Sequence, residues 1–211
     1  MTIFMSDIIC VTNRTLCDDD FLQRIETIAA AHPKGIILRE KDLPESAYQA
    51  LAAQVMEVCK AYDVPCILHR FVRVATALHA DALHVPIPVL REMTTEERTH
   101  FRMLGASCHS LEEAVEAEAL NCTYITAGHI FETDCKKGLA GRGLAFLRTI
   151  CQTVSLPVYA IGGITGNNIS AVRAAGASGA CAMSGFMKCQ DAAAYLRAFE
   201  EVGDRDGFLQ G

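Results

Sequence analysis

The sequence predicts an α/β protein whose eight βα units close into a (β/α)8 barrel. Short apolar runs rich in β-branched residues alternate with longer segments that have helical apolar spacing. The short runs are apolar on both faces, which is typical of parallel strands buried on both sides. Eight such units within 211 residues favour a closed barrel over an open sheet. We therefore expect a single domain over residues 1–211, with a frayed tail at 203–211.

The elements follow one another in a regular order. Helices are predicted from apolar spacing or capping signals, starting near residue 20, over 45–61, 71–79 and 111–121, from residue 144, over 167–175 and near 190–202. Pro86 and Pro88 are expected to end the fourth strand abruptly. Ser110 and Glu113 have the spacing of a capping box for the helix over 111–121. The predicted strands are the apolar runs at residues 7–13, 35–40, 66–70, 82–86, 103–107, 124–127, 157–164 and 179–185.

The composition favours a soluble cytoplasmic protein and argues against nucleic-acid and membrane partners. The formal charge is −6 and no basic run is present, which is atypical of a nucleic-acid surface. No window reaches the ~18 uninterrupted apolar residues of a membrane span, and the N-terminus lacks the pattern of a signal peptide. Ten cysteines without a CxxC pair suggest neither a zinc site nor a thioredoxin motif, so we expect reduced thiols.

The chemically richest stretch is GHIFETDCKKGLAGRG, residues 128–143. It directly follows the sixth predicted strand, so His129 should lie at the carboxyl end of that strand. Active sites of (β/α)8 barrels lie at the carboxyl ends of the strands. The polar and glycine residues predicted at those ends are Arg39, Lys41, His69, His84, Ser107, His109, His129, Thr133, Cys135, Lys136, Gly162, Gly163, Ser184 and Gly185.

Two glycine-containing loops after the seventh and eighth strands predict a phosphate site. Gly162 and Gly163 follow one strand, and Ser184 and Gly185 end the other. Glycine-rich loops that lead into helices present backbone N–H groups to a phosphate. The alternative is that the glycine pair only permits a tight turn.

Four segments resemble the thiamine phosphate synthase and TenI superfamily: LREK at 38–41, ADALHV at 80–85, FETDCKKG at 131–138 and AIGGI at 160–164. The sequence is most similar to the TenI branch, the thiazole tautomerases. The resemblance implies a TIM barrel that acts in thiamin biosynthesis. It also implies a thiazole phosphate as the small-molecule partner.

The residues depart from the synthase pattern, in which the second strand reads QLREK, the third ends in ND and the fourth runs HLGQED. This chain has Ile37 in place of the glutamine, His69 and Arg70 in place of ND, and Val89 in place of the last acid. The synthase needs Mg²⁺ held by carboxylates to neutralise pyrophosphate. A cation at position 70 disfavours that metal, so we expect the tautomerase and no metal or cofactor.

The resemblance assigns a role to each candidate. His129 matches the catalytic histidine of the tautomerases and is the expected acid and base. Gly162, Gly163, Ser184 and Gly185 are expected to bind the phosphate. The expected substrate-binding residues are Arg39, Lys41, Ser107, Thr133, Cys135 and Lys136.

Several alternatives stay open from the sequence. His129 can be a buried histidine satisfied by a backbone carbonyl, and His69, His84 and His109 have no spacing that assigns them to a metal. The chain can also be a thiamine phosphate synthase with a rebuilt metal site, or a binder of thiazole phosphate without turnover. A barrel this rich in apolar residues is a possible homodimer.

Overall fold

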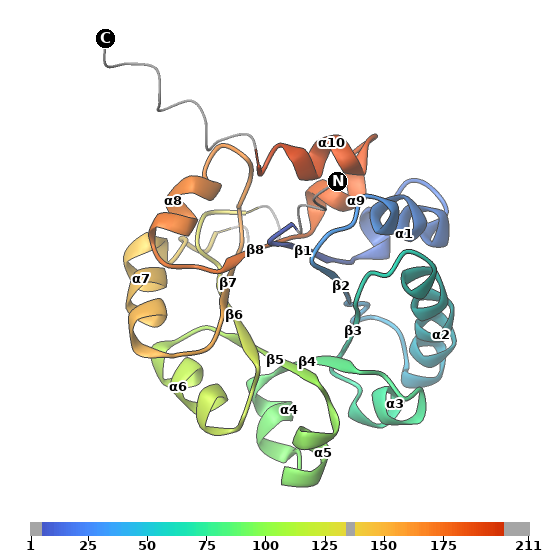
Figure 1. Cartoon of the computed structure of the whole chain (residues 1–211), viewed down its shortest axis with the longest axis horizontal. Helices are drawn as coiled ribbons and strands as arrows, with labels where there is room; N and C mark the ends of the chain where they lie inside the picture. Colours follow the sequence, from blue (N-terminus) through green and yellow to red (C-terminus); the bar gives the residue numbers. More distant parts are fainter. Residues whose placement is uncertain (1–5, 134–137, 201–211) are drawn as a thin grey trace.

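The computed structural model describes residues 6–133 and 138–200 and confirms the predicted (β/α)8 barrel. Eight parallel strands pair in sequence order, and β8 closes the barrel by pairing with β1. The helices form a ring outside the strands (Figure 1). The strands are β1 (Ile8–Val11), β2 (Gly35–Leu38), β3 (Cys66–His69), β4 (Ala82–Pro86), β5 (Met103–Cys108), β6 (Tyr124–Gly128), β7 (Val158–Ile161) and β8 (Gly179–Ala182).

Every predicted helix is present within a few residues of its expected bounds, and additional short helices occur. The helices are α1 (Phe21–Ala30), α2 (Glu45–Ala61), α3 (Val72–Ala77), α4 (Ile87–Glu92), α5 (Thr95–His100), α6 (Leu111–Ala119), α7 (Gly143–Thr153), α8 (Ile169–Ala174), α9 (Ser184–Lys188) and α10 (Ala192–Arg197), with the 3-10 helix η1 at Arg14–Leu16. The sequence reasoning missed α4, α5, α9 and η1.

Prolines explain one of these omissions. Pro86 ends β4 as predicted, but it is also the N-cap of α4, and Pro88 lies in the first turn. Proline is accepted there because the first turn of a helix has N–H groups without intrahelical partners. The capping box of α5, formed by Thr94 and Glu97, was likewise overlooked. The residues that stop β4 therefore also start the next helix.

The predicted capping box of α6 is half right. Ser110 Oγ accepts a hydrogen bond from the backbone N–H of Glu113 at 3.2 Å. The Glu113 carboxylate accepts from the backbone N–H of His109 instead of that of Ser110. The reciprocal bond is therefore displaced by one residue along the chain.

Side chains alternate between the inside and the outside of the barrel. The interior cluster includes Ile9 and Val11 of β1, Ile37 of β2 and Ile67 of β3. Their neighbours Ile8, Cys10, Ile36 and Leu68 belong to the larger core between the strands and the helices. Because successive strand residues face opposite sides, the next inward positions along β2 to β5 are Arg39, His69, His84 and Ser107.

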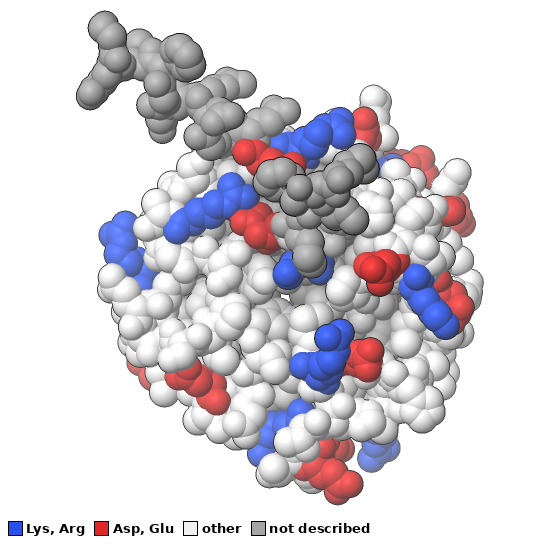
Figure 2. Space-filling view, in the orientation of Figure 1, with Lys and Arg blue, Asp and Glu red and all other residues white. Residues whose placement is uncertain are grey.

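The described cysteines are free thiols, and charges of both signs lie on the surface (Figure 2). The nine described cysteines form no disulfide, and burial raises the pKa of Cys108 and Cys122 to about 12. On the face that Figure 2 shows, acidic and basic side chains are interspersed. Within residues 6–133 and 138–200, no helix has the length and apolar character needed to cross a membrane.

Tyr48 of α2 joins the ends of two strands. Its hydroxyl donates to the carbonyl of Leu38 at 2.8 Å and accepts from the backbone N–H of His69 at 2.7 Å. The side chain is 1% exposed and its ring lies 4.8 Å from that of Phe71. One buried hydroxyl thus satisfies backbone groups of both β2 and β3.

We expect Tyr48→Phe to lower the free energy of unfolding by about 1–3 kcal/mol, because two buried backbone groups lose a partner. The matched control is Tyr62→Phe, whose hydroxyl bonds Glu26 at the surface. That change should alter stability by less than ~0.5 kcal/mol. Urea denaturation of both variants measures the difference, and equal effects would contradict the role given to Tyr48.

Candidate active site

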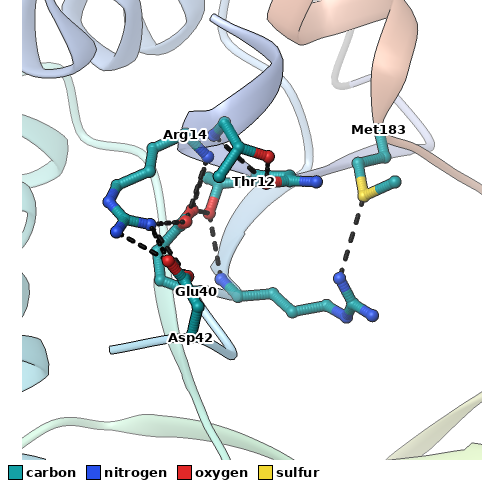
Figure 3. A network of polar contacts seen from close by, with 8 residues as sticks. Thr12, Arg14, Glu40, Asp42 and Met183 are labelled. Atoms are coloured by element: carbon teal, nitrogen blue, oxygen red, sulfur yellow. Dashed lines mark hydrogen bonds and ion pairs between the residues drawn. The ribbon is translucent and has the colours of Figure 1, made fainter. Parts of the chain in front are cut away.

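A buried carboxylate organises the ends of β1 and β2. Glu40 is 1% exposed and accepts from Thr12 Oγ1 at 2.6 Å and from the backbone N–H of Arg14 at 3.0 Å. Arg14 also pairs with Asp42 through contacts of 2.7–2.8 Å (Figure 3). The Arg14 guanidinium lowers the pKa of Asp42. These charge-assisted bonds hold the two loops in one arrangement.

This network positions Arg39, one of the predicted substrate-binding residues. The backbone N–H of Arg39 donates to Thr12 Oγ1 at 2.9 Å. Its Nη1 lies 4.0 Å from the sulfur of Met183, which follows β8. Met183 immediately precedes Ser184, so the guanidinium reaches the end of the barrel wall that carries a predicted phosphate loop.

Lys41 is placed differently from the expectation. In a second strand that continued past residue 40, alternation would place Arg39 and Lys41 on one face. The strand β2 ends at Leu38, and Lys41 lies in the turn that follows, with an exposed side chain. Strand alternation therefore does not orient it, although its charge still acts on His69.

Ser107 ends a buried chain of hydrogen bonds. His84 is 3% exposed, and its Nδ1 lies 3.0 Å from Tyr124 Oη while its Nε2 lies 2.8 Å from Ser107 Oγ. Burial is the main reason that the pKa of His84 falls to about 3, and burial also raises the pKa of Tyr124. In the tautomer with hydrogen on Nε2, Ser107 accepts from His84 and keeps its own hydroxyl hydrogen for a ligand.

His69 faces the same mouth from β3. Its ring lies 6.2 Å from that of His84 in a stacked arrangement, and its buried Nδ1 has no hydrogen-bond partner in the described protein. Burial, then His84, then the cations Arg39, Lys41 and Arg70 lower the pKa of His69 to about 2. The imidazole is therefore neutral at physiological pH.

Arg70 follows β3 with a left-handed backbone, at φ 62°. Its N–H donates to the carbonyl of His84 at 3.0 Å, and its guanidinium lies 4.9 Å from the ring centre of Phe71. Asn and Asp are several-fold enriched in this conformation, whereas a long side chain is uncommon there. The position that the synthase pattern gives to an acid thus holds a cation at the rim.

His129 lies at the end of β6 as predicted, but its ring is largely enclosed. The residue is 8% exposed, and Nε2 lies 3.2 Å from the carbonyl oxygen of Leu139. The sequence left open that His129 is a structural histidine bonded to a backbone carbonyl. Nε2 makes such a bond. The other nitrogen, Nδ1, is buried without a partner in the described protein. With hydrogen on Nε2, Nδ1 has a lone pair that can accept a proton. Its neighbour His109 bonds the carbonyl of Gly128 at 2.9 Å.

The glycines of the predicted phosphate loops also have packing roles. Gly162 and Gly163 have φ values of 102° and 65°, and a Cβ added at Gly162 would lie 2.4 Å from the Cβ of His129. A Cβ at Gly185 would lie 2.0 Å from Tyr195 Oη. Ser184 and Gly185 begin α9 instead of ending β8. The turn-forming alternative is therefore real, and phosphate binding at these loops stays a prediction.

The remaining predicted residues divide between described and undescribed parts of the chain. Thr133 is partly exposed at the edge of the described segment, while Cys135 and Lys136 lie outside the described residues.

Three residues that hold the site, Thr12, Glu40 and Tyr48, were not predicted from the sequence. A carboxylate directly after an apolar strand, as in LREK, was the signal for Glu40.

A large cavity lies at the other end of the barrel. It has a volume of about 670 Å³, and its lining includes Lys34, Pro65, Arg102, Thr123 and Pro157, which come just before the strands. Catalytic residues of (β/α)8 barrels come from the carboxyl ends of the strands. The cavity therefore does not belong to the candidate site.

The closed barrel, with polar side chains gathered at the carboxyl ends of its strands, is the architecture of the (β/α)8-barrel enzymes. The profile of the family described as thiamine monophosphate synthase (TMP-TENI) matches residues 8–186. This chain belongs to that family.

Named relatives agree with the family. A thiamine-phosphate synthase 2 of Streptococcus pneumoniae is 35% identical over 195 residues, which cover 90% of this chain and 91% of the relative. A thiamine-phosphate synthase of Fusobacterium nucleatum is 32% identical and covers 86% of this chain and 89% of its own length. The structure of a thiamine phosphate pyrophosphorylase from Pyrococcus furiosus has a TM-score of 0.78 at 27% identity and covers 93% of this chain and 94% of that chain. These names support the synthase alternative better than the tautomerase interpretation.

The pKa values of His69 and His84 predict how stability depends on pH. Unfolded histidines titrate near pH ~6.5, whereas the folded values are about 2 and about 3. Below pH ~6.5 the unfolded chain therefore binds more protons than the folded protein, and the free energy of unfolding falls as the pH drops. Each histidine contributes a slope of about 1.4 kcal/mol per pH unit.

Urea denaturation between pH ~5 and ~8 measures this slope. His69→Phe should reduce it by the contribution of one histidine, whereas His79→Asn, at an exposed site, should keep the parental slope. An unchanged slope in His69→Phe would show that His69 takes up its proton in the folded protein as readily as in the unfolded chain, which would contradict its lowered pKa.

Proposed function

We propose that this protein is a thiazole tautomerase of thiamin biosynthesis. The observation that carries the proposal is the cationic mouth at the ends of β2 and β3. There Arg39, Lys41 and Arg70 act together on the neutral imidazole of His69. Such a mouth attracts an anionic substrate and stabilises negative charge that develops on it.

The tautomerase reaction suits a site with these cations and a neutral imidazole. Its substrate is a dearomatised thiazole that carries a carboxylate at C2 and a phosphate on the ethyl group. One proton moves from ring C2 to the exocyclic carbon, and the ring becomes aromatic. The charge left at C2 after the proton departs spreads onto the adjoining carboxylate, where nearby cations stabilise it. Positioned hydrogen-bond donors and one acid and base complete the requirement.

His129 is the acid and base in this proposal. Its Nε2 bonds the carbonyl of Leu139, which holds the ring. Its Nδ1, which has no partner among the described residues, accepts the proton from C2. The same nitrogen returns that proton to the exocyclic carbon, so the residue is unchanged after each turnover. In this scheme the phosphate lies at the loops after β7 and β8, near the N–H groups of Gly163 and Ser184.

The second candidate is the synthase, which the names of the relatives favour. That reaction joins a pyrimidine methyl pyrophosphate to a thiazole phosphate and expels pyrophosphate, whose charge Mg²⁺ held by carboxylates would neutralise. At the end of β3 this chain has His69 and Arg70, and in α4, which follows β4, it has Val89. A guanidinium and an aliphatic side chain are not magnesium ligands, and the cation disfavours the metal. The residues described there therefore do not fit the metal of the synthase.

Two parallel reactions separate the candidates. With the dearomatised thiazole carboxylate phosphate, we expect the aromatic product to form at the same rate in EDTA and in Mg²⁺. With the pyrimidine pyrophosphate, thiazole phosphate and Mg²⁺, we expect no thiamin phosphate. Chromatography of both mixtures reads the outcome. Efficient Mg²⁺-dependent formation of thiamin phosphate, without tautomerisation, would establish the synthase.

We expect His129→Asn to lower turnover by about 10²- to 10⁴-fold, because asparagine cannot titrate. The affinity for the aromatic product should change little, which calorimetry can check. His79→Asn makes the same change at an exposed site and should turn over like the parent. A His129→Asn variant with parental turnover would leave His129 with a structural role only.

A further inference from the structure

A buried ring nitrogen of His69 lacks a partner at the mouth of the barrel. The residue is 5% exposed, and no described protein atom makes a hydrogen bond to its Nδ1. Leaving a buried polar atom unpaired costs about 1–3 kcal/mol. An atom of this kind indicates a partner that the described part of the chain does not supply.

The neighbouring histidine shows the contrast. In His84 both ring nitrogens have protein partners, the hydroxyls of Tyr124 and Ser107. The two rings are stacked with an angle of 19° between their planes. His69 therefore lies beside a fully paired imidazole, while its own Nδ1 has no partner among the described residues.

The backbone around His69 is firmly held. Its N–H is bound by the buried hydroxyl of Tyr48, and the following N–H, that of Arg70, is bound by the carbonyl of His84 at 3.0 Å. The ring extends from a strand whose preceding inward residue, Ile67, is part of the interior core. A ligand at the mouth thus meets an imidazole in a fixed place, which reduces the entropy lost on binding.

The charges around His69 select the chemistry of that ligand. Arg39, Lys41 and Arg70 all act on it as cations. The acids nearest in sequence, Glu40 and Asp42, form salt bridges with Arg14. A neutral imidazole among cations favours an anion that can accept a hydrogen bond, and a carboxylate is such a group.

We propose that His69 is a specificity-determining residue that donates a hydrogen bond from Nδ1 to the carboxylate of the substrate. This inference rests on the proposed function, because it assigns that site a carboxylated thiazole phosphate. A ligand without the carboxylate leaves Nδ1 buried and unpaired, and sites built in this way reject such analogues strongly. No proton leaves His69 in this role, so it differs from that of His129.

Calorimetric titration of two aromatic ligands tests the proposal without any turnover. The ligands are the thiazole phosphate with a carboxylate at C2 and the same molecule with hydrogen there. The parent should prefer the carboxylated ligand. His69→Phe, which removes the donor and keeps a flat ring, should reduce this preference about 10- to 100-fold. His69→Asn, whose amide can donate, should retain part of the preference, and the surface variant His79→Asn should retain all of it.

A nuclear magnetic resonance measurement on the parent covers the case in which His69→Phe does not fold. The ¹⁵N signal of His69 Nδ1 should shift with the carboxylated ligand and stay in place with the other. The proposal is wrong if His69→Phe weakens both ligands equally, or if the signal does not respond to the carboxylate. A protein that forms no aromatic product but still distinguishes the ligands through His69 would overturn the proposed function alone.

Discussion

The closed parallel barrel imposes one constraint from which the candidate site follows, the alternation of side chains along each strand. Interior positions such as Ile37 and Ile67 are apolar and fill the barrel, while two residues further toward the carboxyl ends Arg39 and His69 are polar. Eight strands in one circle bring those ends together at a single mouth. His69 and His84 are therefore neighbours although 15 residues separate them in sequence. Because both rings are buried, their pKa values fall and both stay neutral.

Local pattern was sufficient to predict most of the fold. The strand β4 has the predicted bounds, because two prolines limit it, and α2 was predicted at its observed bounds from apolar spacing. The short helices α4 and α9 were not predicted, because six and five residues are too few for helical apolar spacing to be recognised. Strand β8 was predicted too long, over residues 179–185 instead of Gly179–Ala182. The residues after it start α9, and this helix is too short for its periodicity to mark the boundary.

The site was predictable as a location but not as a set of contacts. The position of His129 at a strand end follows from sequence, whereas its bond to Leu139 joins two residues ten positions apart and has no sequence signal. The two bonds made by the Tyr48 hydroxyl join three consecutive elements, β2, α2 and β3, through residues 10 and 21 positions apart. Such contacts arise from tertiary packing, so local sequence patterns do not predict them. The proposed catalytic and phosphate roles stay predictions.

Family membership and the residues at the strand ends bear on different aspects of function, the first on the family and the second on the reaction. The match over residues 8–186 establishes the family, and the named relatives favour a transferase. The charges at the ends of β2 and β3 favour a reaction that stabilises an anion without a metal. Members of one fold family differ in chemistry when residues at the strand ends change.

A crystal structure with the aromatic carboxylated thiazole phosphate bound would show which end of the ligand meets the cations. We expect the carboxylate to lie against His69 and the cations that follow β2 and β3, with the phosphate at the loops after β7 and β8. A ligand bound with its phosphate among Arg39, Lys41 and Arg70, and its carboxylate elsewhere, would contradict this expectation.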